Sequence, residues 1–399
     1  MHSLGEAAAK PRLLFIDPSS FPRCRCTSST LGIMPHFNLI FPWVISLLYC
    51  IIHRKLFFIT QMNTSNELRL AAHLQIQEQL RQSATHRFNE INKKYAESGS
   101  ILKEELKKII LKKLCITHKL AIILIDIQND FVLHGFALYA PAGENTLIRN
   151  MALLDALIEL IANYPELCQQ IEIVTTQDAH VFGRTQDHID AQIMTQGYGQ
   201  IHAHRVLRIE HHELQQLNPE HGQYGLHCLC GTIGAAISQP IEERLNILEE
   251  EISIYRFAKI NFSAPEAGMK LKEGIDLSDP RLLKEMDNIY EDYALSFLQF
   301  FRDKSYNELL ITGICGNICV QQAAEGLAEA GEKVSVLDPC VHYLVIPNMS
   351  SYDDVWTTVQ KSYAVKGINS IELTDFQSNP EWQNQRKHEL LNNEHALTL

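Results

Sequence analysis

Residues 308–331 read ELLITGICGNICVQQAAEGLAEAG, and this stretch joins a buried strand to an amphipathic helix. The run Glu308–Ile314 is almost continuously apolar, as is typical of a parallel strand that is covered on both faces. Small and apolar residues then recur at helical spacing through Ile318–Ala330, and Gly331 follows as a helix-terminating residue. The stretch therefore predicts one strand–helix unit of an α/β sheet, with Cys319 in the first turn of the helix.

The same alternation extends to both sides of this unit. Further apolar runs occupy residues 120–126, 171–176, 252–257, 333–338 and 370–375, and helical patterns occupy 144–163, 289–304 and 353–365. Strands that alternate with helices indicate a parallel sheet covered on both faces. We therefore predict a three-layer α/β/α domain with a six-stranded parallel sheet over residues 118–375.

Three further regions flank this domain. Residues 62–117 read as a helical arm that SGS at Ser98–Ser100 divides into two helices. Packing or dimerisation is its simplest use, which allows a homo-oligomer. Residues 376–399 form a polar tail, and residues 1–61 form an apolar and basic extension.

The apolar segment Phe37–Ile52 is shorter than the roughly 20 residues of a spanning helix, and Pro42 interrupts it. Three interpretations remain: a short membrane anchor, a buried appendage, or translated upstream sequence outside the working protein. We favour the last, with Met62 as the start of a cytoplasmic protein.

Composition excludes several classes of protein. The 399 residues are 46% hydrophobic and 21% charged, an ordinary globular balance. The formal charge of −12 argues against a nucleic-acid partner. Ten cysteines without a CxxC pair indicate neither a disulfide scaffold nor a zinc ribbon.

Three residues with complementary chemistry stand at the predicted strand ends. Asp126 ends the first strand, Lys259 follows the strand at 252–257, and Cys319 begins the helix after Glu308–Ile314. Because ligands of open α/β sheets bind at the carboxyl ends of the strands, we expect these side chains to meet. Alone, each has an ordinary explanation as a turn residue, a solvated charge or a buried thiol. Together they supply an acid, a cation and a nucleophile.

Cys319 is the candidate nucleophile. A helix N-terminus and a nearby ammonium group both lower the pKa of a thiol. We predict Asn317 as the N-cap, which makes Cys319 the second helical residue. Asp126 would accept the thiol proton, and the backbone N–H groups of Cys315 and Cys319 would hold an oxyanion.

The order DIQNDF, K-x-x-x-S-A and GICGNICVQQAAEGLAEAG resembles the isochorismatase-like cysteine hydrolase superfamily. The resemblance covers roughly residues 118–375 and implies that Asp126, Lys259 and Cys319 are the catalytic triad. It also implies a cis peptide bond between Ile314 and Cys315.

A second set of residues offers metal ligands. Asp178 and His180, in TTQDAH, share one side of an extended segment, and His227 stands in YGLHCLCGTIGAA. This arrangement resembles the nicotinamidase pattern, in which such residues bind a divalent metal. Two imidazoles and a carboxylate suit Zn, Fe or Mn. His188 is a further candidate ligand, but a solvated His-rich loop over residues 188–221 is the favoured explanation for it.

The resemblance implies a metal-dependent amidase that converts nicotinamide to nicotinate and ammonia through a thioester, in pyridine nucleotide (NAD) salvage. Phe131 and Tyr224 would stack on the pyridine ring. Three departures from the pattern put the substrate in doubt: Pro265 replaces an aromatic residue, Glu266–Asn288 is a polar insertion, and the segment between the two histidine motifs is long. The alternatives are a metal-free hydrolase of another small amide or ureido compound, and a non-catalytic interaction protein.

Overall fold

The computed structural model describes residues 40–115, 119–180, 227–259, 262–280, 282, 289, 295–345 and 351–372. The chain divides into two compact units, residues 1–63 and residues 64–399. Helix α1 runs over Ile40–Leu114. The predicted polar tail, most of the extension, His188 and Tyr224 lie outside the described residues. None of the helices in the described residues combines the length and apolarity that crossing a membrane requires.

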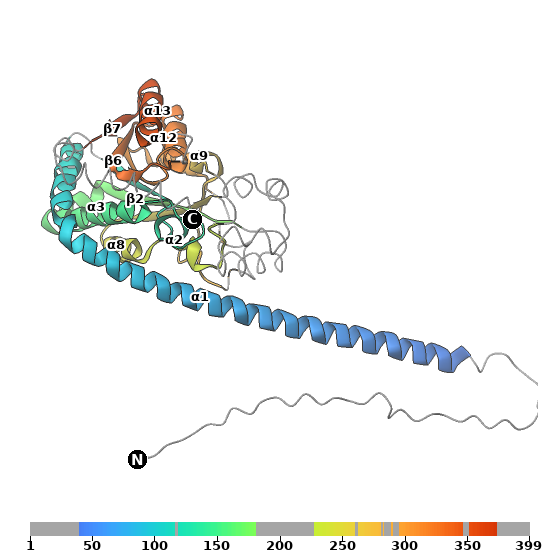
Figure 1. The fold of residues 1–399 in the computed structure, drawn as a ribbon. Helices are drawn as coiled ribbons and strands as arrows, with labels where there is room; N and C mark the ends of the chain where they lie inside the picture. The colour runs from blue at the N-terminus through green and yellow to red at the C-terminus, as the bar shows by residue number, and fades with distance from the viewer. Residues whose placement is uncertain are drawn as a thin grey trace, which may run out of the picture. The chain divides into compact units, whose positions relative to one another are not determined.

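A seven-stranded sheet forms the centre of the unit 64–399, in the order β4-β3-β2-β1-β5-β6-β7 (Figure 1). Its strands are β1 (Leu120–Ile125), β2 (Ile171–Asp178), β3 (Ile254–Lys259), β4 (Met269–Lys270), β5 (Glu308–Ile314), β6 (Val334–His342) and β7 (Asn369–Ile371). Six of these strands run parallel, as predicted. The prediction of six strands was one too few, because β4 pairs antiparallel with β3 at the edge. This edge strand lies inside the segment that the sequence marked as a polar insertion.

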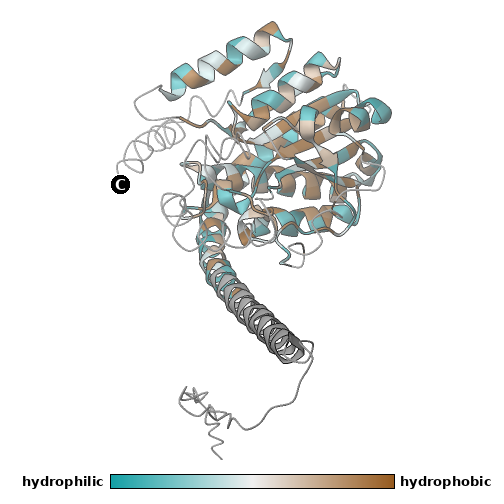
Figure 2. Ribbon diagram, turned by 90° about the vertical axis from the view of Figure 1, so that its right-hand side faces the viewer, coloured by the Kyte–Doolittle hydropathy of each residue, from teal (hydrophilic) through white to brown (hydrophobic). Residues whose placement is uncertain are grey.

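Helices cover both faces of the sheet, which confirms the three-layer architecture. One face carries α3 (Gly143–Asn163), α8 (Gln239–Glu249) and the later part of α1. The other carries α9 (Ala264–Ala267), α11 (Phe297–Lys304), α12 (Cys319–Glu329) and α13 (Tyr352–Val365). Successive residues of β1 alternate between the two cores, as a strand's geometry requires. Figure 2 shows the strands mainly in hydrophobic colours, whereas the helices carry both hydrophobic and hydrophilic colours.

Helix α1 continues through Ser98–Ser100, so the predicted division of the arm into two helices was wrong. A glycine inside a helix costs only about 1 kcal/mol. On either side of the break, α1 buries apolar side chains in the same core as α3, including Phe88, Ile91, Leu102 and Leu106. Each such side chain contributes roughly 1.5–3 kcal/mol when fully buried. Packing therefore outweighs the local preference for a break.

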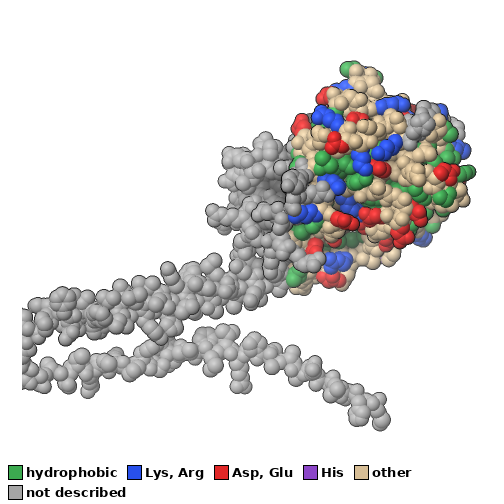
Figure 3. Space-filling view, turned by 180° about the vertical axis from the view of Figure 1, so that it is seen from behind, with side chains coloured by type: hydrophobic (Ala, Val, Ile, Leu, Met, Phe, Trp, Pro, Cys, Tyr) green, Lys and Arg blue, Asp and Glu red, His purple; other side chains and the backbone are tan. Residues whose placement is uncertain are grey.

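Basic and acidic side chains are interspersed on the described part of the face that Figure 3 shows. Exposed pairs of opposite charge in the described residues include Arg81 with Glu78 on α1 and Lys366 with Glu329.

Candidate active site and metal centre

The three predicted catalytic side chains meet at the carboxyl ends of the central strands. Lys259 Nζ lies 2.9 Å from Asp126 Oδ2 and 3.7 Å from Cys319 Sγ. Asp126 and Lys259 are fully buried, and Cys319 is 7% exposed. An isolated ammonium group in the interior would be costly, so Lys259 depends on the neighbouring carboxylates for charge compensation.

The backbone that carries Asp126 is held in an uncommon conformation. Its φ of 53° lies in the left-handed region, where a non-glycine residue costs of order 1–3 kcal/mol and where functional residues cluster. The backbone N–H of Asp126 donates to Thr176 O at 3.1 Å, and Thr176 Oγ1 donates to Asp126 Oδ1 at 2.7 Å. A Cβ on Gly313 would lie 2.1 Å from Ile125 O, so β5 can approach this strand end only with glycine there.

Cys319 is the first residue of α12, and Ile318 occupies the N-cap position. The prediction of Asn317 as the N-cap was therefore wrong by one residue. Asn317 instead binds the backbone of Leu344, donating from Nδ2 to the carbonyl at 3.0 Å and accepting the N–H at 2.8 Å. Because Cys319 is at the helix start, its own N–H has no acceptor within the helix.

The turn between β5 and α12 contains the cis peptide bond that the resemblance implied, between Ile314 and Cys315. The carbonyl of Cys315 accepts the N–H groups of Ile318 and Val320, at 3.0 and 3.1 Å. These bonds tie the turn to the start of α12. That the N–H groups of Cys315 and Cys319 hold an oxyanion stays a prediction.

Asp178, His180 and His227 form a compact group. Asp178 is the last residue of β2, His180 follows it by two residues, and His227 comes from a segment later in the chain. Their ligand atoms all lie within 4.8 Å of one another, and all three residues are buried. Asp178 Oδ2 is 3.6 Å from His227 Nε2 and 4.0 Å from His180 Nε2. Burial and the neighbouring His227 lower the pKa of His180 to about 3, so this imidazole is in the neutral form that binds metals. The donor set fits a divalent metal such as Zn, Fe or Mn.

Two residues that the sequence interpretation missed hold the segments that carry the candidate metal ligands. Gln128 pairs with the backbone of Asp178, donating to its carbonyl at 2.8 Å and accepting its N–H at 2.7 Å. Asp130 Oδ2 accepts the N–H of Cys228, next to His227, at 2.7 Å. Both belong to DIQNDF, where Asp126, Gln128 and Asp130 stand at alternate positions directly after a buried strand. That spacing was the available signal for a role in the interior.

A cavity of about 50 Å³ lies between the Cys319 thiol and the candidate metal ligands Asp178 and His227. Asp178, His227, Cys315 and Cys319 line it together with apolar and aromatic side chains: Phe131, Leu138, Tyr139, Ala140, Phe262, Ile314, Ile318 and Leu344. The ring of Phe131 lies 5.6 Å from that of His227, at 57°. Phe131 therefore lies beside both the cavity and a candidate ligand, and its stacking on a substrate ring stays a prediction.

Burial dominates the electrostatics of the thiol and of Asp126. It raises the pKa of Asp126, and Lys259 opposes that shift. It also raises the pKa of Cys319 well above the ordinary thiol value, again against the pull of Lys259. The ammonium group thus acts as predicted on the thiol, but burial outweighs it. Burial disfavours the charged form of Asp178 too, yet Lys259 and the bond to His227 hold its pKa below the usual range.

Comparison with protein-family models and with curated proteins finds no match for this chain. Solved structures that are similar to it include nicotinamidases and an isochorismatase family protein. The nicotinamidase of Bacillus subtilis has 16% identity and a TM-score of 0.40, over 64% of this chain and 99% of that one. The pyrazinamidase of Pyrococcus horikoshii, in complex with zinc, has 17% identity and a TM-score of 0.36, over 64% and 99%.

The isochorismatase family protein of Desulfovibrio vulgaris has 18% identity and a TM-score of 0.36, over 65% of this chain and 97% of that one. These proteins fall in the group that the motifs resemble.

Proposed function

We propose that this chain is an isochorismatase-like cysteine hydrolase that acts on a small amide, with nicotinamide as the substrate. One observation carries the proposal: a buried lysine contacts Asp126, Asp178 and Cys319 at once. A buried ammonium group with two carboxylates and a thiol is costly to assemble for stability alone. Its chemistry suits acyl transfer to sulfur.

The reaction begins with Cys319 in its thiol form, because burial raises the thiol's pKa. Asp126, whose own pKa is raised, accepts the thiol proton as the sulfur attacks the carboxamide carbon. The N–H groups of Cys315 and Cys319 stabilise the carbonyl oxygen as it gains negative charge. Asp126 then passes the proton to the nitrogen that leaves as ammonia, and a thioester remains on Cys319.

Hydrolysis of the thioester repeats the same steps with water. Asp126 takes one proton from the water that attacks the thioester carbon, and the C–S bond breaks to release nicotinic acid, which gives up its remaining proton to the solvent as nicotinate. The proton returns to the sulfur of Cys319. Throughout, Lys259 compensates the negative charge that moves between the carboxylate and the thiolate.

Asp178, His180 and His227 would hold the divalent metal, which when bound supplies a Lewis-acid contact for the pyridine nitrogen. The residues around this group would orient the pyridine ring of the substrate. Phe131 packs beside His227 at the cavity wall and can cover one face of a planar ring. The cavity connects this group to the thiol, so a ring held at one end presents its substituent to Cys319.

Ammonia and nicotinate release from nicotinamide by the full chain, supplied with Zn²⁺, tests the proposal. We expect turnover in the wild type and none in Cys319→Ala. If the wild type is inactive on nicotinamide and active on another small amide without metal, the metal-free alternative is correct. If no small amide is hydrolysed, the scaffold is non-catalytic.

A further inference from the structure

Helix α1 places a buried polar side chain against the segment that carries His227. Gln77 is 3% exposed and stands on the same stripe of α1 as the buried Ala84 and Ile91, at successive seven-residue steps. Its Oε1 accepts the backbone N–H of Ile233 at 2.7 Å. A buried glutamine needs hydrogen-bond partners, and Oε1 of Gln77 has one on a segment that is distant in sequence.

Ile233 belongs to the His227 loop, which is defined here as residues 227–237. Ile233 is the first residue of the short helix η3 (Ile233–Ala235), so its N–H has no acceptor inside that helix. The carbonyl of the same residue accepts Nδ2 of Asn129 at 2.8 Å. One residue of the loop is thus held by side chains of two different elements.

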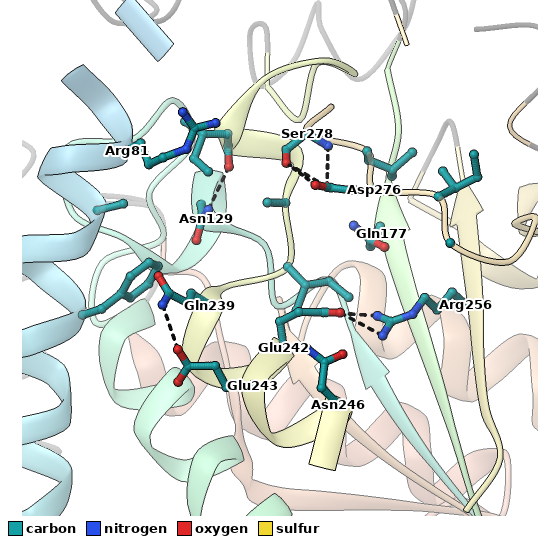
Figure 4. A pocket seen from close by; sticks show the side chains of 18 of the residues that line it. Arg81, Asn129, Gln177, Gln239, Glu242, Glu243, Asn246, Arg256, Asp276 and Ser278 are labelled. Atoms are coloured by element: carbon teal, nitrogen blue, oxygen red, sulfur yellow. Dashed lines mark hydrogen bonds and ion pairs between the residues drawn. The ribbon is translucent and has the colours of Figure 1, made fainter. Parts of the chain in front are cut away.

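This contact reaches the side of the loop that faces a cavity. Ile233, Ala236 and Ile237 line this cavity of about 640 Å³, whose wall includes Arg81 and Thr85 of α1. Figure 4 shows Arg81 and Asn129 among the residues that surround it. Ile233 and Ile237 also pack against the core that α1 shares with α3, so the bond to Gln77 acts together with this packing to set the position of the loop.

The inner side of the loop is joined to the candidate metal ligands. The N–H of His180 donates to Cys228 O at 3.1 Å, and the N–H of Cys230 donates to His180 O at 3.0 Å. Gln128 Nε2 bridges the carbonyls of Asp178 and Ala235, at 2.8 Å each. A displacement at Ile233 is therefore transmitted to both sides of the metal-binding group.

We propose that Gln77 is a positioning residue, through which α1 fixes the His227 loop and thereby the affinity of the site for its metal. Any effect on catalysis rests on the proposed function, but the effect on metal binding does not. Outer partners of metal ligands commonly change metal affinity by about 10- to 100-fold when they are removed. We expect a change of that size from losing the Gln77 acceptor.

The experiment measures Zn²⁺ affinity of the full chain by competition with a chromophoric chelator, and hydrogen exchange of residues 227–237 by mass spectrometry. Gln77→Leu should weaken Zn²⁺ binding about 10-fold or more and speed exchange in the loop. Gln77→Glu, which keeps the acceptor, should restore most of the affinity. Gln82→Leu is the matched control, because Gln82 is exposed and bonds only to Glu78 among the described contacts. It should change neither readout.

Ile233→Pro tests the same bond from its other end by removing the donor. Thr232, at φ −115° and ψ 152°, has the extended backbone that a residue before proline prefers. If Gln77 acts through Ile233, the double variant should bind Zn²⁺ no more weakly than the weaker single variant. This variant also decides the matter if Gln77→Leu does not fold.

Unchanged Zn²⁺ affinity and loop exchange in folded Gln77→Leu, or in Ile233→Pro, would overturn the inference. So would an equal loss in Gln82→Leu. Neither readout uses nicotinamide. A chain that binds Zn²⁺ and does not hydrolyse nicotinamide would refute the proposed reaction and leave the role of Gln77 intact.

Discussion

Asp178 and Lys259 are register partners on the neighbouring parallel strands β2 and β3, and Lys259 Nζ forms an ion pair with Asp178 Oδ1. The other carboxylate oxygen, Oδ2, lies 3.6 Å from His227 Nε2 and 4.0 Å from His180 Nε2. One carboxylate therefore belongs both to the candidate metal site and to the cluster around the thiol. We therefore expect its charge to couple metal binding to Asp126 and Cys319, the residues proposed to exchange the proton.

Replacing Asp178 should consequently damage two functions at once. In Asp178→Asn, we expect Zn²⁺ affinity to fall at least 10-fold, since a charged ligand becomes neutral. The free energy of unfolding should also fall, by up to about 3–5 kcal/mol, because the buried ammonium group of Lys259 loses the charge of one of the two carboxylates beside it. Urea unfolding and chelator competition on the same preparation measure the two effects.

Glu329→Gln is the control for this prediction. It removes one carboxylate from an exposed pair with Lys366, whose side chains are 65% and 28% exposed. Exposed pairs contribute about 0–1 kcal/mol. Equal destabilisation by the two variants would contradict the special role of the buried pair.

The ammonium group of Lys259 should govern the reactivity of the thiol. Lys259 lowers the pKa of Cys319, whereas burial and both carboxylates raise it. In Lys259→Met, we expect the rate at which iodoacetamide alkylates Cys319 to fall roughly 10-fold for each unit by which the thiol's pKa rises. Amidase activity should be lost as well. Mass spectrometry of the Cys319 peptide gives the rate, and an unchanged rate in a folded variant would refute this account.

The meeting of Asp126, Lys259 and Cys319 could be predicted because parallel strands share one carboxyl edge, so residues at strand ends must lie together. Asp178 and His180 could be predicted as a pair of ligands for a different reason: alternate residues of an extended segment share a face. The register that sets Asp178 beside Lys259 could not be predicted. It depends on how β2 and β3 slide past each other, and neither strand's sequence encodes that directly.

Contacts between segments that are distant in sequence could not be predicted either. Gln77 resembled any other polar residue of the arm, and its burial follows from how α1 packs on the domain. Strand β4 was missed because two residues carry no periodicity. The pKa of Cys319 is raised because burial outweighs the opposing effect of Lys259, and the burial of the thiol could not be predicted from the sequence.

The two cysteines of the β5–α12 turn should differ sharply in function. Both line the cavity, but only Cys319 has its sulfur beside Lys259 Nζ, at 3.7 Å. Cys319→Ala should reduce turnover at least about 1000-fold while the protein stays folded and binds Zn²⁺. Cys315→Ala keeps the backbone N–H that is assigned to the oxyanion and should retain most activity. If Cys315→Ala is the inactive variant, the nucleophile is assigned to the wrong thiol.

Metal removal should affect substrate orientation far more than thiol chemistry. His227→Ala leaves Asp178 and His180 as the remaining ligands of the described group, so we expect it to lose bound metal. Nicotinamide hydrolysis should then fall roughly 100-fold or more, the size of a lost orientation effect. Cys319 should still react with a small alkylating agent, because Lys259 and Asp126 are unchanged.

Chelation of the wild type is the reversible form of the same test. Activity should disappear with the metal and return when Zn²⁺, Fe²⁺ or Mn²⁺ is added, and the ion that restores the highest rate identifies the functional metal. Elemental analysis must accompany the kinetics, so that the metal content and the rate refer to the same sample. A wild type that contains no metal and hydrolyses nicotinamide at the full rate would show that Asp178 serves Lys259 alone and that orientation comes from the cavity walls.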